Sequence, residues 1–362
     1  NRDIIELAED KEELIKVLDN IGYDKMKPEI LFLKQEDVIK AGLLDMKMVL
    51  AETEKTFKMI GQNQIINPTK VFMGMPSNEN WDSYCMSMPA YIGGDVDTAG
   101  FKWAAESKAN AQLEGVPYGI DIVILSDPKT VFPKAILDGT ITTAMRTSAT
   151  AGVMAKYNAL KGTKVACLVG AGVIGRTMIM AMMEAVPTLE EIHMVDLVKE
   201  KAEGLAKEFE GKIKVVPYTD VKEAVKDAQL LVTETTSRKP FIKKEWLKPN
   251  MTVIQMEGQS CEEDILLTAD RVVLDNWSQM SHLVGILVHE LYEAGKLKKE
   301  DIVELPEMVN GVQVRQNEEQ FVYCGSAGVG SVDIAIAAKL YENAKKMGIG
   351  QKLNLWDNPL WV

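Results

Sequence analysis

The chain lacks any apolar run near the roughly 20 residues that a membrane-spanning helix needs. Its first residues, from Asn1 to Glu6, show no signal-peptide pattern. Basic residues are also scarce: 41 Lys and Arg stand against 53 Asp and Glu, so the net charge is −12. This deficit argues against nucleic acid or an anionic membrane as a partner.

Cysteine is rare as well, with four residues in a chain of 362. They stand far apart, at Cys85, Cys167, Cys261 and Cys324, and form no C-x-x-C pair. We therefore expect no zinc or other metal site and no disulfide framework. A reducing cytoplasm is the simplest compartment for such a chain.

The most informative pattern is a glycine-rich turn. The apolar run 165–169 leads directly into Gly170, Gly172 and Gly175, spaced as G-x-G-x-x-G, and a helical pattern follows. In a strand–turn–helix these glycines allow the tight turn, the approach of a pyrophosphate and close packing of the helix. The expected cofactor contacts at this turn are Gly170, Gly172, Val173, Ile174 and Gly175.

A second mark supports a dinucleotide site. Residues 191–195 resemble the next strand and end in Asp196, which lies 21 residues after Gly175 (196 − 175). A carboxylate there is placed to hold the ribose hydroxyls of NAD and to repel the 2′-phosphate of NADP. The sequence therefore predicts NAD as the cofactor, although a glycine turn without any ligand is the simpler alternative.

Hydrophobic periodicity divides the chain into three kinds of segment. Residues 3–20, 46–60, 135–160 (with a break near 138–139) and 326–347 have helical spacing, whereas short strand-like runs separated by turns indicate an antiparallel meander over 69–125. Strands and helices then alternate over 162–275, as in a doubly wound parallel sheet. The strands expected there are 164–169, 191–195, 212–216, 230–233, 252–256 and 271–274.

This order predicts the α/β class and two domains. A Rossmann-type doubly wound parallel sheet that binds NAD is expected over 151–311. It is inserted into a discontinuous α+β domain, residues 1–150 plus 312–362, which we expect to bind substrate and to form a dimer.

At this point the sequence resembles the ornithine cyclodeaminase/mu-crystallin family over roughly residues 30 to 345. The motifs stand in the family's order and co-occur, which makes the resemblance specific. They are Met88-Pro89, Gly100-Phe101-Lys102, Ser126-Asp127-Pro128-Lys129-Thr130, Thr143-Ala144-Met145-Arg146-Thr147, the glycine turn, and Ser326-Ala327-Gly328 with Asp333-Ile334-Ala335.

The resemblance implies an NAD(P)-dependent enzyme acting on an L-amino acid or its imine, usually a dimer. Lys102 matches the family lysine that reaches the substrate carboxylate and reacting carbon, and Arg146 matches the arginine that binds the same carboxylate. Lys70 falls where many members have a second carboxylate-binding arginine. The plainer alternatives are a surface lysine at Lys70 and a helix-surface arginine at Arg146.

Two departures from the family matter for the substrate. Met86 occupies the position of a glutamate that contacts the distal amine in ornithine cyclodeaminases, so we expect an apolar pocket wall and a poor fit for free L-ornithine, unless Asp82 or Glu106 replaces that acid. The segment 256–264 has no clean match to the family's catalytic aspartate, which leaves Asp264, Glu257 and Glu263 as candidates. The motifs around Met86 and Lys102 look closer to a siderophore-precursor dehydrogenase branch.

The implied reaction is hydride transfer at the α-carbon of an amino acid or an N-substituted amino acid. Arg146 and Lys70 would orient the carboxylate, and Lys102 would pass protons. The nicotinamide is expected near Thr233, Thr235, Ser326 and Gly328. Two other functions stay open: a cyclodeaminase that uses NAD within each turnover, and a mu-crystallin-like binding protein.

Overall fold

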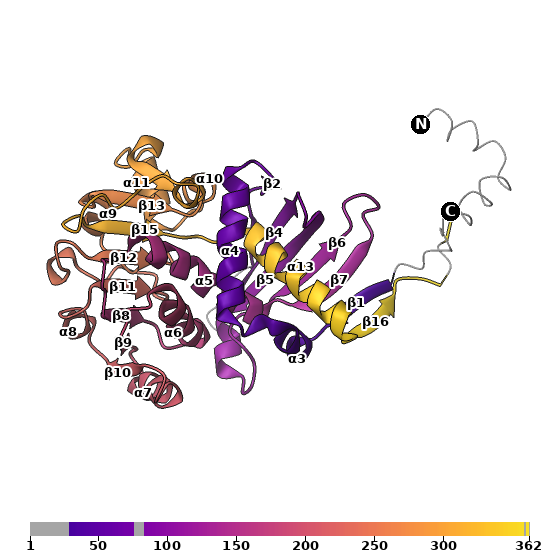
Figure 1. The fold of residues 1–362 in the computed structure, drawn as a ribbon, viewed down its shortest axis with the longest axis horizontal. Coiled ribbons are helices and arrows are strands. Elements are labelled where there is room, and N and C mark those ends of the chain that lie inside the picture. Colours follow the sequence, from indigo (N-terminus) through magenta and orange to yellow (C-terminus); the bar gives the residue numbers. More distant parts are fainter. Residues whose placement is uncertain (1–28, 76–82, 358–359, 362) are drawn as a thin grey trace.

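The computed structural model describes residues 29–75, 83–357 and 360–361. The helix expected over 3–20 and the residue Asp82 lie outside these ranges. Within them the chain forms two lobes, each built on one sheet, with helices α4 and α5 standing between the sheets (Figure 1).

One lobe contains an eight-stranded, mainly antiparallel sheet with the order β16-β1-β7-β6-β5-β4-β2, and β3 also pairs with β4. The expected meander is present as the antiparallel run β4 to β7. β1 lies parallel to β7 and antiparallel to β16, so both ends of the described chain enter this sheet. The strands are β1 (Glu29–Leu33), β2 (Ile65–Ile66), β3 (Val71–Gly74), β4 (Ser83–Ile92), β5 (Thr98–Ser107), β6 (Ile122–Ser126), β7 (Pro133–Asp138) and β16 (Gln351–Asn354).

The other lobe contains an eight-stranded sheet in which all neighbours run parallel. Its order, β10-β9-β8-β11-β12-β15-β13-β14, reverses direction between β8 and β11, which is where α/β sheets of this kind bind ligands. The strands are β8 (Val165–Val169), β9 (Glu191–Val195), β10 (Lys214–Tyr218), β11 (Leu230–Thr233), β12 (Thr252–Gln255), β13 (Arg271–Leu274), β14 (Ile302–Glu304) and β15 (Val322–Gly325). The α/β class and the parallel sheet expected from the sequence are confirmed.

Helices cover both sheets and join them. α13 packs on β4, β5 and β6, and α5 packs against α4 and α6. The α-helices are α3 (Gln35–Val38), α4 (Met46–Gly61), α5 (Thr140–Asn158), α6 (Val173–Ala185), α7 (Lys199–Glu208), α8 (Val221–Ala224), α9 (Glu263–Leu267), α10 (Trp277–Met280), α11 (Leu287–Glu293), α12 (Leu305–Val309) and α13 (Gly330–Met347). Single turns of other helix types are η2 (Ile39–Leu43), η3 (Lys108–Gln112), η4 (Lys244–Trp246) and η5 (Lys299–Asp301).

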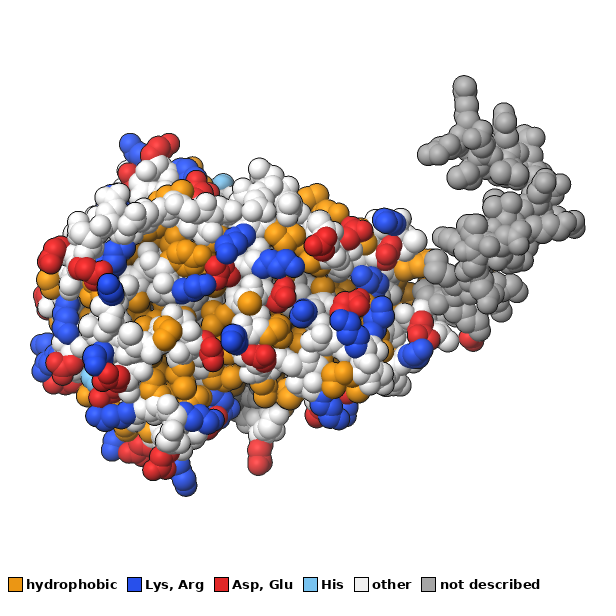
Figure 2. All heavy atoms as spheres, in the orientation of Figure 1, with side chains coloured by type: hydrophobic (Ala, Val, Ile, Leu, Met, Phe, Trp, Pro, Cys, Tyr) orange, Lys and Arg blue, Asp and Glu red, His pale blue; other side chains and the backbone are white. Residues whose placement is uncertain are grey.

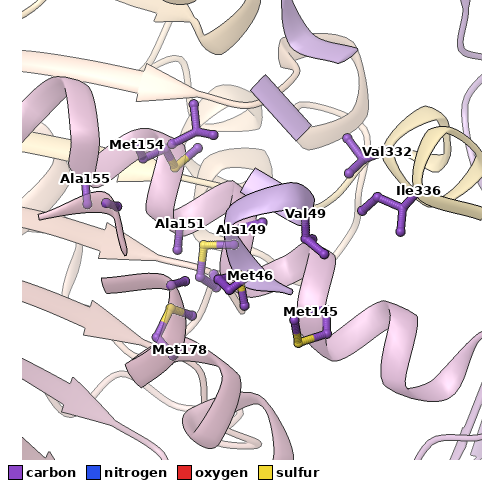
Figure 3. Packing of buried hydrophobic residues seen from close by; sticks show 14 of the residues in the cluster. Met46, Val49, Met145, Ala149, Ala151, Met154, Ala155, Met178, Val332 and Ile336 are labelled. Atoms are coloured by element: carbon purple, nitrogen blue, oxygen red, sulfur yellow. The ribbon is translucent and has the colours of Figure 1, made fainter. Parts of the chain in front are cut away.

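The two lobes share one hydrophobic core along these helices. Met46 of α4, Met145 and Met154 of α5 and Met178 of α6 lie in a single cluster of buried side chains (Figure 3). Flexible methionine side chains fill irregular gaps between helices that cross at different angles. The helix α5 therefore packs against helices of both lobes, α4 and α13 on one side and α6 on the other.

Two expectations from periodicity are corrected. Residues 135–138 are not helical: they belong to β7, which pairs with β1 and β6, and the helix begins only at Thr140. Pairing on both sides overrides the local preference of Ala135 and Leu137 for helix. The third parallel strand, β10, begins two residues later than expected.

The parallel sheet also extends further along the chain than the sequence indicated. β14 and β15 lie beyond residue 275, and β15 lies within 312–362, the range expected to belong to the other domain. β15 forms hydrogen-bonded pairs with β12 and β13 in the centre of the parallel sheet. Because of this pairing, we place the point at which the chain returns to the antiparallel lobe after Gly325 and not at residue 312.

The surface of the described part carries charges of both signs. On the face drawn in Figure 2, basic and acidic side chains are interspersed over both lobes, with hydrophobic side chains between them. Among the helices of the described residues, none is both long and apolar enough to cross a bilayer.

Candidate active site

The glycine turn joins β8 to α6 in the geometry of a nucleotide-binding loop. Gly170 has a positive φ of 112°, which an L side chain rarely adopts. A Cβ on Gly175 would lie 2.0 Å from the Gly170 carbonyl oxygen, so only glycine permits this contact. A Cβ on Gly172 would meet nothing within 4 Å, which means that the space before the N-terminus of α6 is open. An open helix N-terminus favours an anion such as a pyrophosphate.

Asp196 is held against this loop. Its carboxylate accepts hydrogen bonds from the backbone N–H of Ala171 (2.9 Å) and from that of Val198 (2.9 Å). The side chain therefore lies at the end of β9 beside the turn, where a ribose is expected. Val173 is half exposed in the first turn of α6, and Ile174 packs against the core.

Lys102 of β5 lies at the centre of a charged cluster between the lobes. It is 1% exposed, and its Nζ lies 3.1 Å from Asp333 Oδ1 and 3.9 Å from Asp121 Oδ2. Nζ also donates to Thr143 Oγ1 at 3.2 Å. Burial lowers the pKa of Lys102, and the nearby Arg146 lowers it further, whereas Asp333 and Asp121 oppose this shift.

Arg146 of α5 shares the same acid. Its Nε lies 3.1 Å from Asp333 Oδ1, so one carboxylate oxygen in the first turn of α13 holds both cations. Gly328, in the turn before α13, has a positive φ of 75° that favours glycine, and a Cβ there would lie 2.4 Å from Arg146 Nη1. Arg146 is 7% exposed, and its ion pair with Asp333 supplies the partner that a buried charge requires.

Lys70, which precedes β3, joins the cluster from a third direction. Its Nζ donates to the carbonyl oxygen of Ala327, and its backbone N–H donates to Gln279 Oε1. Burial lowers the pKa of Lys70 to about 8, Asp275 raises it, and Arg146 and Lys102 lower it. Lys70 is therefore partly buried, with specific hydrogen bonds to the turn 326–328 and to α10.

The turn 326–328 links the cluster to the parallel sheet. Asp275, which directly follows β13, accepts hydrogen bonds from Ser326 Oγ (2.7 Å), from Ala327 N (3.0 Å) and from Gly328 N (2.7 Å). Burial raises the pKa of Asp275. Ser326 and Gly328 thus shape the turn that Lys70 and Arg146 contact.

The ends of β11 and β12 carry two glutamates with different surroundings. Glu257 accepts hydrogen bonds from Thr233 Oγ1 and from Ser260 N, so its carboxylate ties the two strand ends together. Thr235 packs near Gly170, and its hydroxyl accepts from Ser237 N. Glu234 lies between these threonines, and its Oε2 is buried without a hydrogen-bond partner.

Met86 lies on the same face of the antiparallel sheet as Lys102. The register pairs Met88 with Lys102, Met86 with Ala104, and Tyr84 with Glu106, and opposed residues of antiparallel strands point to one side. Burial raises the pKa of the Tyr84 phenol, and the charge of Glu106 and a hydrogen bond with it raise this pKa further. The wall therefore contains a carboxyl group as well as the apolar side chains expected from the sequence.

The candidate Asp264 lies elsewhere. It is exposed in the first turn of α9, where it interacts with Lys244, and its neighbour Glu263 pairs with Lys296. The acids that interact with the cationic cluster in the described structure are Asp121, Asp275, Asp333, Glu106 and Glu234. None of the described residues forms a group of three or more His, Cys, Asp or Glu arranged to hold a metal ion.

Sequence reasoning missed most of these acids, although two left a signal. Asp333 is the lone charge in the apolar run 329–338, and Asp275 follows directly after the buried strand β13. A buried acid in such a setting requires a partner. Glu234 gave no comparable signal in the sequence, because its position in the site depends on which strands lie next to each other in the sheet.

With this geometry described, the chain can be compared with known proteins. A model of the ornithine cyclodeaminase/mu-crystallin family matches residues 29–348. The chain belongs to this family. The match extends over both lobes and includes the glycine turn and the cationic cluster.

Members of the family with known activities resemble the whole chain. The N-((2S)-2-amino-2-carboxyethyl)-L-glutamate dehydrogenase of Staphylococcus aureus is 26% identical over 337 residues, covering 91% of this chain and 100% of that protein. An archaeal alanine dehydrogenase dimer with bound NAD is 28% identical, with a TM-score of 0.81 and 91% and 100% coverage. The Thermococcus litoralis Δ1-pyrroline-2-carboxylate reductase, solved with NADH and L-proline, is 27% identical, with a TM-score of 0.80 and 90% and 100% coverage.

Proposed function

We propose that this chain is an NAD-dependent oxidoreductase that transfers a hydride at the α-carbon of an L-amino acid, of its N-substituted form, or of the corresponding imine. One observation carries the proposal: Lys70, Lys102 and Arg146, from three separate elements, form one cluster. Arg146 interacts electrostatically with Glu234, which follows β11 at the point where the parallel sheet reverses its order. A substrate carboxylate that bound these three cations would lie near the nucleotide-type loop.

The three cations suit an α-carboxylate. Arg146 offers a planar guanidinium, which binds carboxylates through paired hydrogen bonds, and Lys102 and Lys70 add point charges. Asp333 fixes Lys102 and Arg146 relative to each other, so the substrate meets a preorganised site. Fixing the carboxylate in this way orients the neighbouring α-carbon.

The residues around the glycine turn fit NAD. Gly170, Gly172 and Gly175 leave the N-terminus of α6 open for the pyrophosphate, and Asp196 is placed for the adenosine ribose. When bound, NAD supplies the acceptor or donor of the hydride. Relatives named as NAD or NADH complexes support this cofactor.

The substrate is proposed to be an amino acid with an N-substituent or an extended side chain. The Staphylococcus aureus relative is named for an N-substituted glutamate. The face formed by Tyr84, Met86, Ala104 and Glu106 offers a surface for such an extension beyond Lys102.

The test is a panel of candidate substrates. Purified protein is mixed with NAD and with L-alanine, L-norvaline, L-proline, L-ornithine or N-((2S)-2-amino-2-carboxyethyl)-L-glutamate, while NADH absorbance, ammonia and product mass are followed. A dehydrogenase accumulates NADH in proportion to oxidised product. Proline and ammonia formed from ornithine without NADH would indicate a cyclodeaminase, and NAD binding without any turnover would indicate a binding protein of the mu-crystallin kind.

We further propose that the protein is a cytoplasmic homodimer. The four cysteines are free thiols in the structure, which suits a reducing compartment. The edge strand β3 exposes Val71, Phe72 and Met73, and a relative is described as a dimer. Pairing this edge with its symmetry mate would cover the three side chains.

A further inference from the structure

Glu234 occupies the position in the parallel sheet where a bound ligand is expected. It follows β11 directly, and β11 and β8 are the two strands between which the sheet reverses its order. A Cβ on Gly170 would lie only 2.1 Å from the Glu234 carbonyl oxygen. The backbone of Glu234 therefore touches the first glycine of the nucleotide-type loop.

Among the described residues, one oxygen of the Glu234 carboxyl group has no hydrogen-bond partner. Its Oε2 is buried and accepts no hydrogen bond in the described structure, whereas both oxygens of neighbouring Glu257 accept from Thr233. Burying a polar oxygen without a partner destabilises a fold, so such groups concentrate at functional sites. The two glutamates thus have distinct roles: Glu257 ties strand ends together, and Glu234 keeps an oxygen available.

The charged groups facing Glu234 come from both lobes. Burial raises the pKa of Glu234 to about 8; Glu257 and Glu106 raise it, and Arg146 lowers it. Arg146 and Glu106 belong to α5 and β5, so the Glu234 carboxyl interacts electrostatically with the cationic cluster. Its backbone contacts the nucleotide-type loop at Gly170, so Glu234 links that loop to the groups proposed to bind the carboxylate.

We infer that Glu234 exchanges the proton of the substrate nitrogen, an inference that rests on the proposed function. In amine oxidation the ionised Glu234 carboxylate takes a proton from the substrate ammonium, which leaves a neutral amine. The Cα–H bond then breaks with hydride transfer to NAD, and the nitrogen lone pair forms the C=N bond of an iminium. The products are the iminium, NADH and protonated Glu234, so charge and electrons balance. Reduction reverses these steps.

This role fixes the sign of one limb of the pH profile. Amine oxidation requires ionised Glu234, so kcat rises as the pH rises through the pKa of this group. Lys70 acts in the opposite sense on kcat/KM, because it loses the charge that binds the carboxylate as the pH rises through about 8. The wild-type profile of kcat/KM is therefore bell-shaped, and the two limbs belong to different residues.

The experiment compares the wild type with Glu234→Gln, which keeps the shape of the side chain, with Glu234→Asp, and with Glu210→Gln, an exposed control on the parallel lobe. The probe is whichever member of the substrate panel gives the fastest NADH formation. We measure kcat and kcat/KM between pH 6 and 10, the Kd for NADH by fluorescence, and Tm. We expect Glu234→Gln to lower kcat by about 10²–10⁴-fold and to lose the rising limb, with the Kd and Tm nearly unchanged. Glu234→Asp should keep the rising limb at a reduced rate.

Each outcome separates the inference from the proposed function. If Glu234→Gln keeps most of its activity, or loses only NADH affinity while the profile keeps both limbs, the inference is overturned and the proposed function stands. If the wild type forms no NADH with any member of the panel, both are overturned. The Glu210→Gln variant should behave as the wild type throughout.

Discussion

A single carboxylate at the end of β9 is expected to select the cofactor. Asp196 is fixed by two backbone N–H groups, the next residue, Leu197, is 94% exposed, and Lys199 is paired with Glu203. No arginine at 197 or 198 is present to hold a 2′-phosphate. We expect Asp196→Ser to reduce the ratio of kcat/KM for NAD over NADP by about tenfold, which corresponds to roughly 1.4 kcal/mol. A wild type that used NADP as well as NAD would contradict this assignment.

Lys102 is expected to matter for both activity and stability. Lys102→Ala removes a cation from the carboxylate site, so activity should fall on the order of a hundredfold or more. It also leaves the buried carboxylate of Asp333 with one cationic partner in place of two, which costs on the order of 1–3 kcal/mol. Activity, Tm and NADH binding of Lys102→Ala are compared with those of Lys164→Ala, an exposed lysine. Near-normal turnover of Lys102→Ala would contradict the role proposed for Lys102 in the site.

At the scale of elements, the β4–β5 pair is expected to select the substrate. Glu106 lies four residues beyond Lys102 on the same face, a spacing of about 13 Å along a strand, which is longer than free ornithine. We therefore expect L-ornithine to remain a poor substrate even though an acid is present on this wall. Glu106→Gln should lower kcat/KM for a long N-substituted substrate with a free amino group and leave L-norvaline unchanged. Ornithine as the substrate with the highest kcat/KM would show that a nearer acid is used.

At the scale of the whole molecule, the exposed edge strand predicts a dimer. Val71, Phe72 and Met73 are 65%, 56% and 50% exposed in succession, an arrangement that single chains usually avoid at a sheet edge. Light scattering at micromolar concentration should give twice the 40.1 kDa mass of the chain. Phe72→Glu should shift this mass toward that of the monomer, whereas Val284→Glu, at an exposed site on the other lobe, should not. A wild type with the monomer mass would exclude the pairing.

Features that depend on neighbours in sequence could be predicted from the sequence. The glycine turn and the alternation of strands and helices reflect local sequence, and the acid 21 residues later recurs at a fixed spacing from the turn; together they indicated the parallel sheet and the nucleotide-type loop correctly. Local signals failed where tertiary pairing overrode them: β7 has the composition of a helix, yet two neighbouring strands hold it extended. β15 escaped notice because its place in the sheet is set by β12 and β13, which precede it by many residues.

The sequence by itself determined which residues are candidates, namely Lys70, Lys102 and Arg146, through their place in family motifs. Only the tertiary structure decided what surrounds them. Lys70 and Asp333 are 263 residues apart in the chain (333 − 70), and their electrostatic interaction exists because α13 packs on the antiparallel sheet. The exposed position of Asp264 and the buried, unpartnered oxygen of Glu234 likewise follow from which surfaces meet. Local sequence encodes backbone geometry, whereas the charge environment of a site is the sum of contacts between distant segments.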